Sequence, residues 1–543
     1  MATTDGIVLA WLDGMGTLVD DLSRPEAYGE HEAGPVEVIA THISWVFRMP
    51  TEVFKVKRPV DLGFLDFRTI EARRRACDAE LILNQRLAPA VYLDVVPIHR
   101  DAQGRHALKG DGQVVDWAVR MVRLPDLERA DALLARGELG GGEIDRLATK
   151  LAEFHSSVRC DAETARHGQP DAIQGNVEEN FAATRAWGDR YLTEHDARAV
   201  ERFQRDFLRG HVELLERRAR EKHVRDGHGD LRLEHVYVDA RRDIRVIDCI
   251  EFNERFRFAD VCADLAFLAM DLSWHGRSDL AERLLARYAQ ATDDYDLYAV
   301  VDFYESYRAY VRGKIAGMMA ADPDAPDEAR ARGAEEARRY FLLALVADRR
   351  PVVSPVVVAV GGMIASGKST VADALGLALG APVIDADRTR KHLLGVAPEH
   401  PVHDRAWEGA YGLGVTNRVY DEVLRRADVV LASGRPVVLD ASFRAAGQRD
   451  AARALAERHN VPFHFVECMA SEEVCRDRLH RRAAGGGVSD GRLAIFDEFR
   501  ARYEDVVELS PAQHIVLDTA QPLERSLAKL RATLPTWPRG VPG

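Results

Sequence analysis

The sequence predicts two domains of different class: an N-terminal α+β domain and a C-terminal α/β domain built on a parallel sheet. The first observation is length, because 543 residues exceed what a single hydrophobic core normally supports. The second is a phosphate-binding pattern, G-x-x-x-x-G-K-[ST], which starts at Gly362. The third is the alternation of strand-like and helix-like segments from Val356 onward, which is typical of a parallel sheet.

The composition is that of an ordinary globular protein, with 46% hydrophobic and 30% charged residues. The net charge is −13 and there is no large basic block, which argues against nucleic acid as a partner. No apolar run reaches the about 18 residues of a membrane span, and the first residues lack the pattern of a signal peptide. The six cysteines form no C-x-x-C pair, which indicates reduced thiols. We therefore expect a cytoplasmic protein with no membrane partner; no oligomeric state is predicted.

The N-terminal part begins with a lead segment, residues 1–35, that carries no motif. Short alternating runs then predict antiparallel strands, and longer periodic stretches predict helices. The predicted strands cover residues 36–40, 45–47, 52–57 and 114–121, and the predicted helices cover residues 69–87, 143–158, 260–270 and 301–319. This domain is expected to span residues 36–345, and residues 346–355 form the predicted linker.

A candidate phosphotransfer site lies between residues 228 and 252. A loop opens with His228-Gly229-Asp230, and a predicted strand that starts at Ile244 leads to Asp248. In such an arrangement Asp230 would accept the proton of a substrate hydroxyl, and Asp248 would hold Mg²⁺. The alternative is a pair of solvated turn aspartates, which the combination of motif and spacing disfavours.

These residues resemble the aminoglycoside phosphotransferase and choline kinase branch of the protein-kinase-like fold. There the loop is H-G-D-x-x-x-x-N and the metal-binding aspartate begins I-D-[WF]. The resemblance covers about residues 36–345. It implies a strand lysine paired with a helix glutamate in nucleotide binding: Lys55, with Lys57 as second choice, and Glu80.

Three features depart from that pattern. His235 stands at the asparagine position, and a neutral imidazole is a poor ligand for Mg²⁺, so His235 is a metal-ligand candidate only if a second metal is retained. Cys249 replaces the aromatic residue. No glycine occurs in residues 35–62, so residues 41–44 either replace a glycine-rich lid or form a plain hairpin connection. The N-terminal site is accordingly predicted to be either active or degenerate.

The C-terminal phosphate loop has the required context, with an apolar run at residues 356–360 before it and a predicted helix at residues 371–379 after it. Glycines allow backbone N–H groups to wrap a phosphate at the helix N-terminus. Lys368 would reach the β- and γ-phosphates of ATP, and Ser369 would hold Mg²⁺. The predicted ATP-binding residues are Gly362, Ala365, Ser366, Gly367, Lys368, Ser369 and Thr370.

Two aspartates follow the next predicted strand, residues 382–384. Asp387, in D-x-x-R-K, is the preferred general base and Asp385 the second choice, with a helix N-cap as the alternative for both. A further apolar strand, residues 436–440, ends at Asp440, which is expected near Mg²⁺ as in a Walker B arrangement.

A predicted helix that follows residues 463–468 carries Arg481 and Arg482 and leads to three glycines at residues 485–487. This pattern suits a lid that closes over the transferring phosphoryl oxygens. The alternative is a solvated basic helix.

The C-terminal features resemble the small P-loop kinases, namely gluconate kinase, chloramphenicol phosphotransferase and the zeta-toxin group, over about residues 356–534. The domain order, together with phrases such as Lys55-Val56-Lys57-Arg58-Pro59, resembles bacterial fusions of an aminoglycoside phosphotransferase-like domain with a P-loop kinase (AAA family ATPase) domain. That resemblance covers nearly the whole chain and implies a C-terminal domain at residues 356–543.

The predicted function is ATP-dependent transfer of the γ-phosphoryl group, with Mg²⁺, to a hydroxyl of a small-molecule acceptor. The acceptor class is a sugar, an aminocyclitol or an antibiotic. Two alternatives stay open. One is a regulatory ATP-binding protein whose kinase-like domain is a degenerate sensor, and the other is a toxin-like kinase of a nucleotide-sugar.

Overall fold

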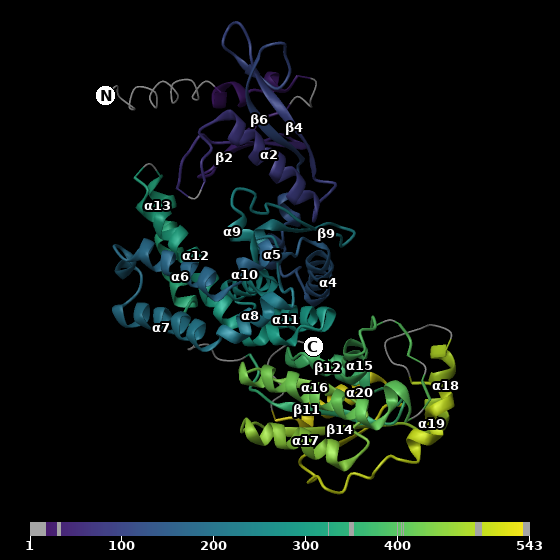
Figure 1. Ribbon diagram of the computed structural model, residues 1–543. Helices are drawn as coiled ribbons and strands as arrows, with labels where there is room; N and C mark the ends of the chain where they lie inside the picture. Colours follow the sequence, from purple (N-terminus) through teal and green to yellow (C-terminus); the bar gives the residue numbers. More distant parts are fainter. Residues whose placement is uncertain are drawn as a thin grey trace. The chain divides into compact units, whose positions relative to one another are not determined.

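The computed structural model describes residues 18–29, 34–63, 65–323, 325–346, 352–398, 400–402, 404–405, 407–483 and 491–535. The backbone divides into two compact units that alternate along the sequence (Figure 1). Unit 1 comprises residues 1–143, 153–175 and 211–264, and unit 2 comprises residues 144–152, 176–210 and 265–543. The domain boundaries expected from the sequence stay a prediction.

Unit 1 contains a six-stranded antiparallel sheet in the order β1-β2-β3-β6-β4-β5. Its strands are β1 (Glu37–Ala40), β2 (Ser44–Arg48), β3 (Glu52–Lys57), β4 (Tyr92–Arg100), β5 (His106–Ala107) and β6 (Gln113–Val122). Strand side chains alternate between faces, so Phe54 and Val56 enter one core cluster. Lys55 and Lys57 therefore lie on the opposite face with Val53, where helix α2 (Ile70–Gln85) packs.

The other described elements of unit 1 lie beside the antiparallel sheet or in the region that contains the aspartate loop. They are η1 (Pro25–Tyr28), η2 (Asp126–Glu128), α3 (Ala130–Ala135), α5 (Ala162–Arg166), α8 (Val212–Arg220), β7 (Val224–Asp226), η4 (Leu233–His235), β8 (Val236–Val238), β9 (Ile244–Val246), α9 (Glu254–Arg257) and β10 (Phe258–Asp260). The strand expected to lead to Asp248 stops at Val246, because Asp248 takes the left-handed backbone conformation with φ 64°. Helices α4 (Gly141–Ser157), α6 (Pro170–Thr184) and α10 (Val261–Trp274) run across the division between the units.

Unit 2 begins with a helical region around the apolar helix α10. Its further elements are η3 (Gly188–Arg190), α7 (Glu194–Gly210), α11 (Ser278–Thr292), η5 (Tyr295–Ala299), α12 (Val301–Ala321) and α13 (Asp327–Leu343). Helices α12 and α13 pack closely at Gly313, where a Cβ atom would lie 2.8 Å from the Phe341 ring. None of the described helices is both long and apolar enough to cross a bilayer.

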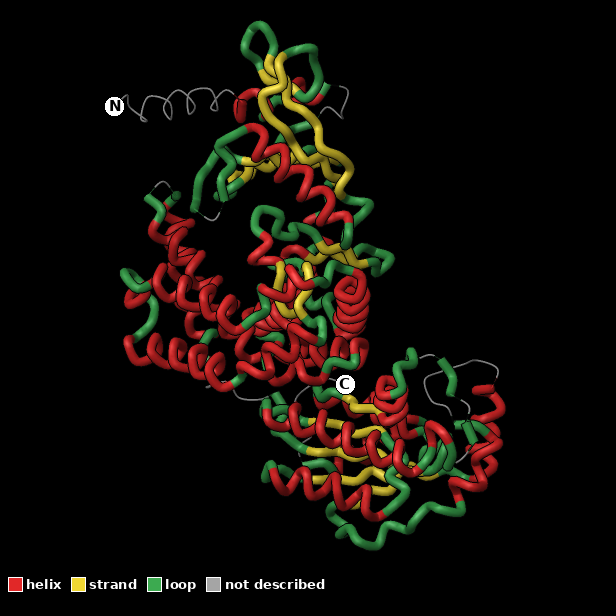
Figure 2. Tube along the Cα trace, viewed as in Figure 1, coloured by secondary structure: helices red, strands yellow, loops and turns green. Residues whose placement is uncertain are grey.

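The rest of unit 2 is a five-stranded parallel sheet in the order β12-β13-β11-β14-β15 (Figure 2). The strands are β11 (Val357–Gly362), β12 (Val383–Asp385), β13 (Val437–Asp440), β14 (Phe463–Met469) and β15 (His514–Asp518). Strand β11 is the middle strand of this order, and it is buried along its whole length because helices cover both faces of the sheet.

Helices cover both faces of this sheet. Helices α14 (Lys368–Leu379) and α20 (Leu523–Thr533) share one core cluster with β11, and α16 (Leu413–Ala432) and α17 (Ala446–Arg458) cover the other face (Figure 2). The remaining elements are α15 (Ala386–Leu393), η7 (Gly409–Tyr411), α18 (Glu472–Ala483) and α19 (Leu493–Arg500). The predicted combination of an antiparallel kinase-like sheet and a parallel P-loop sheet is thus confirmed.

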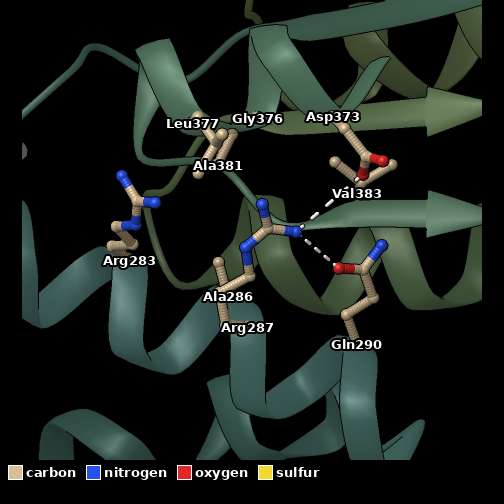
Figure 3. Close-up of a pocket in the computed structure, with 9 residues that line it drawn as sticks. All are labelled: Arg283, Ala286, Arg287, Gln290, Asp373, Gly376, Leu377, Ala381 and Val383. Atoms are coloured by element: carbon tan, nitrogen blue, oxygen red, sulfur yellow. Dashed lines mark hydrogen bonds and ion pairs between the residues drawn. The ribbon is translucent and has the colours of Figure 1, made fainter. Parts of the chain in front are cut away.

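Ion pairs within unit 2 join its helical region to the α/β region. The guanidinium of Arg426, on α16, binds both carboxylate oxygens of Asp293 at 2.6 and 2.7 Å and is only 2% exposed. The Tyr295 hydroxyl donates to the backbone oxygen of Val383 at 2.6 Å, directly on strand β12. A small pocket lies at the same junction, where Arg287 of α11 reaches Asp373 of α14 (Figure 3). These contacts anchor the β12 edge of the sheet.

We expect Arg426→Ala to destabilise unit 2 by about 3 kcal/mol, because it removes a buried guanidinium that binds both carboxylate oxygens of Asp293 and leaves that carboxylate with only the partly exposed His392 as an ion-pair partner among the described residues. The adjacent Arg425 pairs with Asp296 in a contact that is 47% exposed on the arginine side, so Arg425→Ala should cost no more than about 1 kcal/mol. Thermal and urea unfolding of the full chain measure both variants. Equal losses would contradict the interpretation that the buried pair anchors this edge.

Candidate functional site

The phosphate loop connects β11 to α14 at residues 363–367. Gly362 and Gly367 have φ angles of 136° and 89°, which L side chains rarely adopt. A Cβ atom at Gly362 would also lie 2.3 Å from the backbone oxygen of Cys468. The loop ends at the N-terminus of α14, where backbone N–H groups favour a bound anion. The sequence pattern therefore produces the expected phosphate-binding geometry.

Side chains from three segments shape this loop. Lys368 Nζ donates to the backbone oxygen of Met363 across the loop at 2.8 Å. Arg478, from α18, donates to the backbone oxygen of Ala365 at 3.2 Å. The Ser366 hydroxyl is fully buried and has no hydrogen-bond partner among the described residues. The loop thus has a defined shape, with Lys368 held next to it.

Two carboxyl groups lie side by side at the carboxyl ends of β12 and β13. Asp385 and Asp440 are direct neighbours in the register of these strands. Burial and the nearby carboxylate of Asp440 raise the pKa of Asp385 well above its usual range. Burial also raises the pKa of Asp440, although the Lys368 ammonium acts in the opposite direction. The pair therefore retains a proton that isolated aspartates would have lost.

The donors at this point fit Mg²⁺. The Ser369 hydroxyl hydrogen-bonds to Asp440, which brings one hydroxyl and one carboxyl oxygen together beside the phosphate loop. Mg²⁺ in nucleotide sites is usually held by one or two such groups, phosphate oxygens and water. Across the described ranges, no cluster of three or more His, Cys, Asp or Glu side chains forms a metal site. These donors would therefore hold Mg²⁺ together with a nucleotide.

The two candidate bases have different surroundings. Asp385 is the N-cap of α15, and its carboxylate accepts a hydrogen bond from the Arg388 backbone amide at 2.7 Å. Asp387 lies in the first turn of α15 and is half-buried. Both line the cleft that contains Lys368 and Ser369. Asp385 is therefore the helix N-cap that the sequence offered as an alternative, whereas Asp387 stays the predicted general base.

The cleft is open to solvent. The sequence interpretation gave no role to several of its lining residues, which come from separate segments. These are Arg390, Trp407, Tyr411, Thr416, Tyr420, Arg444, Ile495 and Phe499. The sequence pointed to two of these residues. Arg390 is the arginine of the D-x-x-R-K pattern, and Arg444 lies shortly after the β13 strand.

Arg481 pairs with Asp477 on its own helix and is not among the lining residues. The side chain of Arg482 and residues 484–490 lie outside the described residues. The lid that these arginines were expected to form stays a prediction.

The unit 1 site brings together the predicted lysine and glutamate. Lys55 Nζ lies 2.9 Å from Glu80 and 2.5 Å from Asp248. Lys57, the second choice, also contacts Glu80 at 2.6 Å and pairs with Glu251, which the sequence interpretation missed. Burial opposes charge on Lys55, but Asp248 and Glu80 outweigh it and raise the pKa of Lys55 well above its usual range. Both lysines are therefore held as cations.

The aspartate loop of unit 1 is internally paired. The Arg232 guanidinium binds both carboxylate oxygens of Asp230, at 2.9 and 3.0 Å. His235 Nδ1 donates to the backbone oxygen of Asp230 at 2.8 Å, so Nε2, 3.6 Å from Asp248, can carry the lone pair. An imidazole nitrogen beside a lysine-paired carboxylate does not fit Mg²⁺, which prefers oxygen donors. Unit 1 therefore offers a kinase-like arrangement without a clear Mg²⁺ site.

The turn at residues 41–44 has the geometry of a plain hairpin connection. The Ser44 amide donates to the Thr41 hydroxyl at 3.0 Å, and the Thr41 amide donates to the Ser44 backbone oxygen at 2.8 Å. These hydrogen bonds occupy the Thr41 hydroxyl and the backbone amides of Thr41 and Ser44, which are therefore not available to a phosphate.

Residues 357–506 match the AAA domain family. The chain is 33% identical to proteins Rv2004c of Mycobacterium tuberculosis and Mb2027c of Mycobacterium bovis, over 94% of this chain and 98% of each relative; both are described as uncharacterised. The similarity to both relatives therefore extends along almost the whole of this chain.

Two solved structures match parts of this chain. A gluconokinase from Sinorhizobium meliloti is 25% identical over 34% of this chain and 93% of its own, with a TM-score of 0.25. A choline/ethanolamine kinase family protein from Mesorhizobium loti is 13% identical over 61% of this chain and 97% of its own, with a TM-score of 0.38. The strand orders and the positions of the motifs described above confirm the predicted resemblance to both kinase types at the level of fold.

Mg²⁺ binding beside Asp385 and Asp440 should release a proton. The raised pKa values of these two carboxyl groups mean that the pair holds a proton at pH values below them, and the metal ion displaces it. We expect the affinity for Mg²⁺ in the presence of ADP to increase as the pH rises above the range in which isolated aspartates titrate. Calorimetry in buffers of different ionisation enthalpy should detect release of about one proton.

Asp385→Asn should reduce that proton release, since asparagine keeps the helix cap but carries no shared proton. Asp518→Asn, at the end of β15 in the same sheet, is the matched control and should behave as wild type. A pH-independent affinity in the wild type would contradict the shared proton.

Unit 1 should bind nucleotide without a gain from Mg²⁺, because its donors do not suit this ion. In a Lys368→Ala background, we expect the affinity of the full chain for a fluorescent ATP analogue to be the same with and without Mg²⁺. His235→Asn supplies an oxygen donor and should increase the affinity about tenfold when Mg²⁺ is added. A strong Mg²⁺ dependence with His235 in place would show that the imidazole does not exclude the ion.

Proposed function

The chain belongs to the family of the mycobacterial proteins Rv2004c and Mb2027c, and we propose that it is an ATP-dependent phosphotransferase acting on a hydroxyl of a small molecule. One observation carries this proposal. A single cleft contains the phosphate loop, the Ser369–Asp440 donor pair and a further carboxylate, Asp387. These are the groups that phosphoryl transfer requires.

The geometry supports an in-line transfer in this cleft. The loop amides and Lys368 bind the β- and γ-phosphate oxygens and stabilise the charge that develops on them. Asp387 accepts the proton of the acceptor hydroxyl while its oxygen bonds to the γ-phosphorus. The bond from that phosphorus to the β–γ bridging oxygen breaks, and ADP leaves. Mg²⁺ held at Ser369 and Asp440 would draw charge from the phosphate oxygens. We place this reaction in the cytoplasm, where ATP is available.

A second role is proposed for unit 1, favoured by the Asp230–Arg232 pair. A base whose two oxygens are both held by a guanidinium is less available to a substrate hydroxyl. Lys55 and Glu80 retain the nucleotide-binding arrangement. We propose that unit 1 binds a nucleotide or related ligand and adds little to turnover.

The proposal is tested by acceptor-dependent ADP release from the full chain, over a panel of sugars, aminocyclitols and nucleotide-sugars. Lys368→Ala and Asp387→Asn should each lower the rate by about 100-fold or more, because each removes a group that acts in the transition state. Lys529→Ala is the control, since this exposed lysine of α20 donates to the backbone oxygen of Val516 in β15 and is not among the residues that line the cleft.

Asp230→Asn should change the rate far less than either cleft variant. Turnover that survives Lys368→Ala but is lost with Asp230→Asn would assign the reaction to unit 1 and refute the proposal.

A further inference from the structure

Three arginines gather at one part of the unit 2 cleft and its rim, held by aromatic rings. The Arg390 guanidinium lies 4.8 Å from the centre of the Tyr411 ring. Those of Arg444 and Arg502 each lie 4.1 Å from the centre of the Trp407 ring, which stacks on Phe499. Within the described ranges, none of the three forms an ion pair with a carboxylate. Aromatic contacts hold a guanidinium in place but do not neutralise its charge.

Arg390 shows most clearly that this charge is unsatisfied. Its side chain is 6% exposed, and its Nε has no hydrogen-bond partner among the residues that the structure describes. Its Nη1 donates to the backbone oxygen of Ala410 at 2.6 Å, which fixes the side chain without adding a negative charge. A buried donor left in this state costs free energy that a bound acceptor atom would recover.

Arg444 adds a second positive charge at the same place. Burial lowers the pKa of Arg444, and the nearby charges of Arg502 and Arg390 lower it further. The carboxylate of Glu504 is also near, but its hydrogen bond goes to the Ala446 amide at 2.6 Å. The positive charges therefore repel one another, and an anion between them would relieve that repulsion.

The arginines lie close to the predicted base. Arg390 follows Asp387 by three positions in α15, so the two side chains share a helix face, and both line the cleft. Arg444 follows Asp440 closely in sequence, beyond the end of β13, and lines the same cleft. Lys368 and the loop amides already provide for the phosphates of ATP, so this second cationic cluster is available to a different group.

We propose that Arg390, Arg444 and Arg502 bind a negatively charged group of the acceptor, a phosphate, carboxylate or sulfate. The acceptor is then an anionic hydroxyl compound, and neutral sugars and cationic aminocyclitols are poor ligands of this site. This inference rests on the proposed function and names the substrate class of the same cleft. Guanidinium groups suit this role because they bind such oxyanions through paired hydrogen bonds.

The test uses the full chain saturated with Mg²⁺ and a non-hydrolysable ATP analogue, so that the phosphate loop and γ-phosphate positions are filled. Calorimetry compares matched probes: gluconate with glucitol, glucose 6-phosphate with glucose, and glucosamine as a cationic probe. We expect at least one anionic probe to bind about tenfold or more tightly than its neutral partner, and glucosamine not to bind.

Arg390→Gln and Arg444→Gln should each weaken binding of the anionic probe about tenfold, by removing charged hydrogen bonds. Arg444→Lys keeps the charge and should retain part of the preference. The matched control is Arg339→Gln, because Arg339 of α13 lies 3.9 Å from the centre of the Trp274 ring in a contact of the same type outside the cleft. Melting temperatures of all variants show whether a loss of binding reflects a loss of fold.

Three outcomes would overturn the inference. They are equal binding of anionic and neutral probes, binding of no anionic probe, and an anion preference that persists in both glutamine variants. If the variants instead bind the ATP analogue more weakly while no probe binds, the arginines contact the γ-phosphate of ATP. Turnover of a neutral acceptor that is insensitive to Arg390→Gln would refute this inference but leave the proposed function intact. Anion binding without turnover of any acceptor would support this inference but refute the proposed function.

Discussion

The parallel pairing of β13 with β11 and β12 is the constraint on which the unit 2 site depends. Parallel strands end at the same edge, so the phosphate loop after β11, Asp385 at the end of β12 and Asp440 at the end of β13 meet there. The same pairing places two carboxyl groups side by side in a buried setting. The repulsion between the two carboxylates favours binding of a proton or a metal ion, so this edge of the sheet suits Mg-nucleotide chemistry.

Charge is handled differently in the two units. In unit 1, two lysines balance Glu80, Asp248 and Glu251, and Arg232 balances Asp230, so the site is largely neutralised by its own side chains. In the unit 2 cleft, acidic and basic groups are present but separate, with aspartates at the strand ends and arginines on aromatic rings. Uncompensated charges bind ligands, whereas compensated ones mainly maintain a geometry.

The buried contacts within unit 2 connect the helical region to the strand that carries the site. Tyr295 hydrogen-bonds to Val383 of β12, two residues before Asp385, and Arg426 also donates to the Thr389 hydroxyl of α15 at 3.1 Å. Helix α15 carries Asp387 and Arg390. The positions of the candidate base and of Arg390 are therefore set by the helical region of unit 2 as well as by the parallel sheet.

The sequence by itself determined the two fold classes, the phosphate loop and the identities of Lys55, Glu80, Asp230, Asp248, Asp385, Asp387 and Asp440 as candidates, because these depend on local periodicity and on short motifs. Only the tertiary structure decided which carboxylates are paired and which arginines enter the cleft. Arg481 pairs within its own helix, whereas Arg390 and Arg444 meet Trp407 and Tyr411 from distant segments. Contacts between segments far apart in sequence leave no local pattern, and charge compensation depends on just those contacts.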